Sequence, residues 1–198
     1  MSSYTIPYVV EKRAGAERSV DVFSRLLSDR IVYLGTEIDD GVANVLIAQL
    51  LHLESDNPDA PVSLYINSPG GSESAMLAVY DAMQYVRCDV ATICLGQAGS
   101  SAAVLLAGGT PGQRAILAHG RVVLHQPSAQ SRGTIPDLII AADEIARVRA
   151  ELETVLSRHT GKSVETLRRD TDRDLVLPAE QAVAYGLADR VLESRSLR

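Results

Sequence analysis

Runs typical of β-strands alternate along this chain with runs typical of helices, and this alternation constrains the fold more than any other feature. The strand-like runs are Ile31–Leu34, Val62–Ile66, Val90–Leu95, Ala115–Leu117, Val122–Leu124 and Arg190–Leu192. The helix-like runs are Gly41–Glu54, Glu73–Val86, Ser101–Ala107, Asp137–His159, Val164–Arg169 and Ala179–Tyr185. Such alternation predicts a layered α/β fold with a mostly parallel sheet.

Composition limits the classes of protein to which the chain can belong. With 198 residues, 46% of them hydrophobic, it is long enough for one domain with a substantial core. The net charge of −6 argues against a nucleic-acid partner, because no basic patch is present to neutralise phosphates. The two cysteines, Cys88 and Cys94, have neither metal-type nor redox-type spacing, so we expect buried packing residues and no metal or other cofactor.

The N-terminal arm, residues 1–19, carries charges throughout and lacks the apolar stretch of a secretory signal. No apolar run approaches the roughly 20 residues that a membrane span requires. We therefore expect a protein of the reducing cytoplasm that does not bind membranes.

A glycine- and alanine-rich turn, residues 96–102, follows the apolar run Val90–Leu95 directly. A strand that turns here into a helix of small residues places Ser100 at a helix N-terminus, where free N–H groups favour negative charge. A nucleophilic serine works well in such a position. A helix-capping serine is the more common occupant, so other residues must decide between the two roles.

Two further segments supply candidate partners for Ser100. His125 ends a β-branched run that Pro127 stops, so we expect its imidazole at the end of a strand. An acidic partner could be Asp170, Asp172 or Asp174, among which the residues alone do not choose. Taken singly, a core histidine and a solvated acidic turn are the commoner interpretations of these segments.

Taken together, these segments resemble the ClpP family of self-compartmentalising serine peptidases, and the resemblance covers nearly the whole chain. It rests on residues 6–11, 23–30, 65–71, 96–102, 125–127, 159–161 and 185–189. It implies a crotonase-like (ClpP/enoyl-hydratase) spiral of ββα units with a protruding helix-strand handle. The domain organisation it implies is an arm at 1–19, with a short removable pro-segment at 1–5, and one peptidase domain at 20–198.

The resemblance assigns roles to the candidate residues. It implies Ser100 as nucleophile, His125 as base and Asp174 as the carboxylate that orients the base, and it places the oxyanion on the backbone N–H groups of Gly71 and Ser101. Position 101 is usually methionine in the family, but the backbone N–H that would donate is present whichever side chain stands there. A serine–lysine dyad is not expected, because the only lysines are Lys12, in the arm, and Lys162, in a helix-to-helix turn.

A second site of the family is an apolar pocket between neighbouring subunits, where loops of the AAA+ unfoldase and small-molecule activators dock. The matching positions are Ser63, Tyr65, Tyr85, Ile93, Leu95, Ala115 and Leu192. Ser63 and Ala115 stand where large aromatic residues are common, so we expect weaker docking. With a less glycine-rich segment after Pro127, these departures are typical of a divergent, actinobacterial-type paralogue.

The long helix expected at 137–159 corresponds to the handle by which two seven-membered rings stack in the family. Its apolar residues recur at three- and four-residue steps, at Leu138, Ala142, Ile145, Val148, Leu152 and Val155. Its other face carries Glu144, Arg147, Arg149, Glu151 and Arg158, which suits either solvent or an interface.

The function expected is that of a serine endopeptidase subunit that cuts peptides and unfolded polypeptides delivered by the unfoldase. A second hypothesis is a ring subunit that carries the triad but is latent alone and active in a mixed assembly with a sister ClpP. A third is crotonase-type acyl-CoA chemistry, because Gly71 and a helix N-terminus could hold a thioester oxyanion. The complete Ser100, His125 and Asp174 set counts against the third.

Overall fold

A seven-stranded sheet forms the centre of the structure, a computed structural model that describes residues 5–13, 16–127 and 132–193. Five parallel strands lie in the order β3 (Ile31–Leu34), β4 (Val62–Ser68), β5 (Val90–Gly99), β6 (Arg114–Leu117) and β9 (Arg190–Leu192). Two more continue it beside the second half of β5, where β7 (Arg121–Leu124) pairs parallel with β5 and β8 (Leu175–Pro178) pairs antiparallel with β7. The predicted α/β class with a mostly parallel sheet is confirmed.

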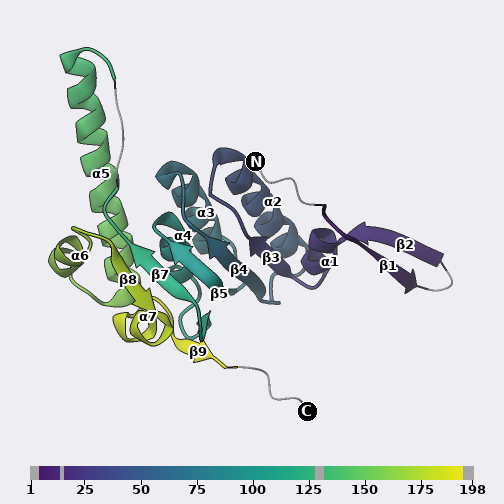
Figure 1. The fold of residues 1–198 in the computed structure, drawn as a ribbon. Coiled ribbons are helices and arrows are strands. Elements are labelled where there is room, and N and C mark those ends of the chain that lie inside the picture. The colour runs from purple at the N-terminus through teal and green to yellow at the C-terminus, as the bar shows by residue number, and fades with distance from the viewer. Residues whose placement is uncertain (1–4, 14–15, 128–131, 194–198) are drawn as a thin grey trace.

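Helices cover one face of this sheet. The helices α2 (Asp40–Asp56), α3 (Glu73–Tyr85) and α4 (Ser101–Ala107) pack side by side (Figure 1). Their buried side chains meet those of alternate strand positions such as Leu64 and Cys94. The intervening positions, including Ser63 and Tyr65, are only half-buried in the single chain. Parallel sheets normally have both faces covered, so the second face of this sheet is unusually open in the single chain.

Two elements project from the body at opposite ends (Figure 1). One is a hairpin of β1 (Tyr8–Arg13) and β2 (Ala16–Asp21), followed by α1 (Val22–Ser28). The other is α5 (Ile135–Thr160), after which α6 (Val164–Asp170) and α7 (Ala179–Tyr185) return to the sheet. The hairpin ends close to the boundary expected at residue 19, and most of the expected pro-segment, residues 1–4, lies outside the described part of the chain.

The predicted runs all appear as strands or helices with nearly the same bounds. The hairpin, α1 and β8 were not predicted from the sequence; β8 ends at Pro178, and proline is uncommon within strands. Among the described residues no helix is both long and apolar enough to span a membrane.

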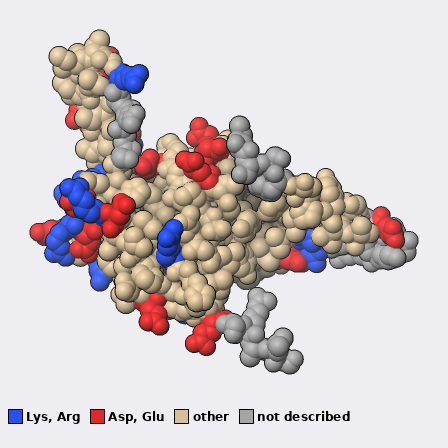
Figure 2. All heavy atoms as spheres, in the orientation of Figure 1, with Lys and Arg blue, Asp and Glu red and all other residues tan. Residues whose placement is uncertain are grey.

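The expectation for the long helix needs correction in two respects. Its apolar stripe is buried only toward the C-terminal end, at Val155 and Leu156, whereas Ile135, Leu138, Ile139 and Ile140 are exposed. Arg149, assigned to the polar face, is half-buried in an ion pair with Glu153, which is itself only 5% exposed. Charged side chains gather over α6 and the lower part of α5, and the projecting tip is mostly uncharged (Figure 2).

Candidate active site

Strand pairing brings the ends of β5, β7 and β8 together, and each candidate residue lies at one of these ends. Gly99 of β5 pairs with Val123 of β7, so the residues that follow, Ser100 and Leu124, are neighbours. Leu124 pairs with Leu175 of β8, and continuing this antiparallel register by one residue places His125 opposite Asp174. Residues opposite each other in such a pair have Cα atoms roughly 5 Å apart. Ser100, His125 and Asp174 therefore lie at one edge of the sheet.

Ser100 has a strained backbone. It joins β5 to α4 with φ 47° and ψ −116°, a region that residues with a side chain rarely occupy. Its N–H donates to the carbonyl of Val123 at 2.7 Å, which fixes the turn against β7. Its hydroxyl makes no capping bond to α4, so the common helix-capping role does not apply.

The loop between β4 and α3 requires two glycines. Gly70 and Gly71 have φ values of 107° and 149°. A Cβ on Gly71 would overlap the backbone of Ile38, and one on Gly70 would lie 2.6 Å from the carbonyl oxygen of Gly99. The loop therefore approaches both neighbours more closely than any other residue allows.

The N–H groups of Gly71 and Ser101 are free to donate. Within the described ranges neither has an acceptor, although the flanking N–H groups of Ile38, Ser72 and Ala103 are bonded. The Ser101 N–H lies in the first turn of α4, where helix N–H groups lack partners. Two unengaged donors beside Ser100 suit an oxyanion.

The side chain of Ser101 has a role that the sequence did not reveal. It is 2% exposed, and its hydroxyl donates to the carbonyl oxygen of Gly71 at 2.9 Å. This bond ties the first turn of α4 to the glycine loop. The methionine usual at this position could not make it.

The side chains of the three candidates are not hydrogen-bonded to one another in the part of the chain that the structure describes. His125 Nδ1 lies 3.0 Å from the carbonyl oxygen of Gln126, which can only accept, so Nδ1 donates this bond and, in the neutral ring, Nε2 is the acceptor. Asp174 is exposed, and no hydrogen bond links it to His125. The three residues therefore lie near one another, but the hydrogen bonds that would link the serine, histidine and aspartate of a working triad are not formed.

The rival carboxylates are engaged elsewhere. Asp170 accepts from the Tyr185 hydroxyl at 3.1 Å, and burial, together with this carboxylate, raises the pKa of Tyr185 to about 12. Asp172 lies 3.9 Å from Arg173 and offers its backbone carbonyl to Gln126. Neither stands opposite His125 in the strand register, which favours Asp174.

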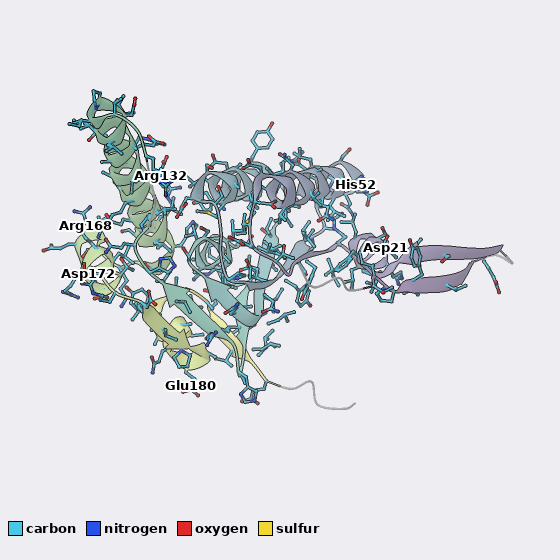
Figure 3. All side chains as sticks on the ribbon, turned by 45° about the horizontal axis from the view of Figure 1, so that its top comes forward. Asp21, His52, Arg132, Arg168, Asp172 and Glu180 are labelled. Carbon is cyan, nitrogen blue, oxygen red and sulfur yellow. The ribbon has the colours of Figure 1, made fainter. Side chains whose placement is uncertain are left out.

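A charged network next to His125 was not found from the sequence, because its members come from three distant segments. Arg149 of α5 donates to the Gln126 side chain at 2.8 Å and to Glu153 at 2.8 Å. Arg168 of α6 binds Glu153 from the other side at 2.6 Å. Arg168 projects from α6 beside the lower part of α5 (Figure 3). Burial acts to raise the pKa of Glu153, but the bonds from Arg168 and Arg149 outweigh it and hold the pKa below its usual range.

A narrow pocket of about 30 Å³ opens between Ser100 and the base of α5. Ser100, Ser101 and His125 line it together with Glu73, Arg149 and Glu153. The remaining walls are mostly apolar side chains of α4, α5 and α6. Asp174 does not line this pocket, so a residue bound there would contact Ser100 and His125 and not Asp174.

The expected docking positions do not form one patch in the single chain. Tyr65, Ile93 and Ala115 face one another across β4, β5 and β6, on the sheet face that helices do not cover. Ile93 and Ala115 are buried there, whereas Ser63, Leu95 and Leu192 are half-buried. Tyr85 lies at the end of α3 and is 78% exposed, apart from the strands.

The cysteines are buried as expected, and burial raises the pKa of Cys94 to about 12, which makes its thiol unreactive. Among the residues described, no group of three or more His, Cys, Asp or Glu side chains could hold a metal ion.

Comparison with known proteins agrees with this geometry. The family model described as Clp protease matches residues 14–195. An ATP-dependent Clp protease proteolytic subunit 4 of Rhodococcus jostii is 62% identical over 97% of this chain and 99% of its own length. A proteolytic subunit 2 of Streptomyces avermitilis is 60% identical over 98% of each chain, and a proteolytic subunit 1 of Corynebacterium glutamicum is 51% identical over 100% of this chain and 95% of its own. These matches also carry the crotonase-like fold that the family resemblance implied. The chain belongs to the Clp protease family of serine peptidases.

Proposed function

We propose that Ser100, His125 and Asp174 are the catalytic triad of this serine endopeptidase, and that the N–H groups of Gly71 and Ser101 hold the oxyanion. The observation that carries the proposal is the strained, uncapped Ser100 at a strand edge shared with His125 and Asp174. Strain of this kind persists where the surrounding structure enforces it and concentrates at functional sites. Acyl-CoA chemistry would leave this serine and its histidine neighbour without a role.

The reaction follows from these positions. Ser100 Oγ attacks the peptide carbonyl carbon while His125 Nε2 takes the hydroxyl proton, and the negative oxygen is held by the Gly71 and Ser101 N–H groups. The intermediate collapses as His125 returns the proton to the departing amine. A water then hydrolyses the acyl-enzyme by the same two proton transfers and frees Ser100.

The bond between His125 and Gln126 supports latency of the isolated chain. The Nδ1 proton is held by a backbone carbonyl, so Asp174 must replace that carbonyl before it can stabilise the charged imidazole. Gln126 is bound to α5 through Arg149, so contacts made by α5 in an assembly can move this segment. We therefore propose that the chain becomes active in seven-membered rings stacked in pairs, with a sister ClpP subunit contributing to the active assembly.

The relatives are named as subunits of an ATP-dependent protease, so we propose that an AAA+ unfoldase delivers polypeptides to this chain in the cytoplasm. The half-buried sheet face with Tyr65, Leu95 and Leu192 is the proposed docking surface, with Tyr85 supplied by a neighbouring copy. The small side chains of Ser63 and Ala115 reduce the apolar area available, which makes docking weaker than on a pocket lined by aromatic residues.

The test is labelling with a fluorophosphonate probe and cleavage of a fluorogenic peptide, on the chain alone and mixed with a sister subunit whose own nucleophile is replaced. Ser100→Ala abolishes both signals, while Ser74→Ala, a change at an exposed serine of α3, leaves them intact. Asp174→Asn lowers kcat about 10⁴-fold if this carboxylate orients His125. Undiminished cleavage by the Ser100→Ala chain, or a loss that follows Asp172→Asn instead, contradicts the assignment.

A further inference from the structure

Glu73 differs from the other charged side chains that line the pocket beside Ser100. It is the first residue of α3, directly after the glycine loop and the capping Ser72, and it is half-buried. Its carboxylate makes no hydrogen bond or ion pair with any residue in the described ranges, whereas Arg149 and Glu153 are bonded to each other. Glu73 therefore has its full capacity to accept hydrogen bonds from a ligand.

Arg149 and Arg168, the two arginines near the pocket, do not occupy the carboxylate of Glu73. Arg149 is bonded to Glu153 and to the Gln126 side chain, and Arg168 reaches Glu153 from α6. Their donors are thus directed at partners within the protein. A cation entering the pocket would find its acceptor at Glu73.

The rest of the pocket suits an apolar stem. Its walls include Val104, Leu124, Leu152 and Leu156, whose aliphatic side chains can pack against the methylene groups of a bound side chain. Lysine combines such a stem with a terminal ammonium, and arginine is the similar alternative. An acidic side chain would be repelled by Glu73.

We propose that Glu73 selects substrates with a basic residue, lysine foremost, on the N-terminal side of the scissile bond. This inference rests on the proposed role of Ser100, because the pocket is lined by that serine and by His125. Glu73 is a specificity determinant that contacts the substrate side chain. Its other effect is to complement the dipole at the start of α3, which acts on stability and not on substrate choice.

The experiment compares fluorogenic peptides that differ only at this position, with lysine, norleucine or glutamate, in whichever assembly the fluorophosphonate labels Ser100. Norleucine keeps the lysine stem and lacks the charge. The wild-type chain has a higher kcat/KM for lysine than for norleucine, and Glu73→Gln lowers that ratio about tenfold and improves the glutamate peptide, as expected for a charge-assisted hydrogen bond at a partly exposed site.

Two further variants separate substrate choice from folding. Glu165→Gln removes the same charge from the first turn of α6, outside the pocket, and leaves the ratio unchanged. Glu73→Asp keeps the carboxylate and retains preference for lysine over norleucine. An equal ratio in wild-type and Glu73→Gln chains that both label at Ser100 overturns the inference and leaves the proposed function intact. Absence of labelling at Ser100 in every assembly overturns the proposed function, and this inference with it.

Discussion

At the scale of single residues, the backbone of Ser100 carries most of the information about the site. A non-glycine residue at φ 47° and ψ −116° costs roughly 1–3 kcal/mol, which neighbouring contacts must offset. Here the offset comes from the bond to Val123 and from the glycines of the facing loop, which leave room for the turn. The strain aims the hydroxyl away from α4 and toward the pocket.

Sequence reasoning could nominate Ser100 and His125 as candidates because each follows or ends a recognisable apolar run, although their roles came from the family resemblance. It could not choose among Asp170, Asp172 and Asp174 without the family pattern, since all three lie in one charged turn and only strand register separates them. The bond of the Ser101 hydroxyl and the position of Glu73 in the pocket depend on how distant segments pack, and no local pattern predicts that.

The Ser101→Ala variant tests the bond that ties α4 to the glycine loop. Without it the carbonyl of Gly71 loses a buried partner, which costs about 1–3 kcal/mol of stability, and the neighbouring N–H becomes less well oriented. We expect kcat to fall by up to about tenfold with little change in KM, a smaller effect than the loss of an oxyanion donor itself. Steady-state kinetics on Ser101→Ala and on the exposed-serine control Ser74→Ala measure this; equal kcat values for both would show that the bond does not support catalysis.

At the scale of elements, α5 shows what the spacing of apolar residues can predict about a helix and what it cannot. Its three- and four-residue apolar spacing predicted a long amphipathic helix, and the helix is present from Ile135 to Thr160. The spacing could not show that only the C-terminal end packs on this chain, because an apolar stripe looks the same whether its cover comes from the same molecule or another. The ion pairs of Glu153 depend on the position of α6, which the sequence also leaves open.

The α5–α6 junction makes stability depend on pH in the acid range. The pKa of Glu153 is depressed in the folded chain, so its contribution is fully present above the ordinary value of 4.5 and is lost as pH falls through the lower folded value. Arg168→Gln removes one of two cationic partners, which raises that folded pKa. We expect a melting temperature a few degrees lower at pH 7 and a shallower decline below pH 4.5.

Thermal unfolding followed by circular dichroism between pH 3 and 7 measures both effects. The matched control is Arg169→Gln, on the same helix, whose partner Asp170 is not bonded to α5. If the two variants give the same curves, the junction does not depend on the Arg168 to Glu153 pair.

At the scale of the whole molecule, the single chain leaves apolar surface uncovered in two places. One face of a parallel sheet is only partly covered, and the tip of α5 exposes four large aliphatic side chains far from the body (Figure 1). The sequence predicted the α/β architecture well because local periodicity determines it. Composition alone could not predict which apolar surfaces stay open, since that depends on the relative placement of finished elements.

The exposed tip of α5 leads to a prediction about assembly. Ile139 and Ile140 are 56% and 68% exposed, and each would contribute roughly 1.5–3 kcal/mol if fully buried between two rings. Because such a contact would be repeated by every subunit of the proposed ring, an Ile139→Asp, Ile140→Asp double variant should separate stacked rings into single rings of half the mass. Native mass spectrometry measures this directly, with Val176→Asp, a change at an exposed aliphatic residue of β8, as the control that keeps the full mass.

Since α5 also contacts the Gln126 side chain through Arg149, the separated rings should lose peptidase activity as well. A double variant that keeps the mass of stacked rings, or an active wild-type monomer, would exclude the tip of α5 as the ring-to-ring contact.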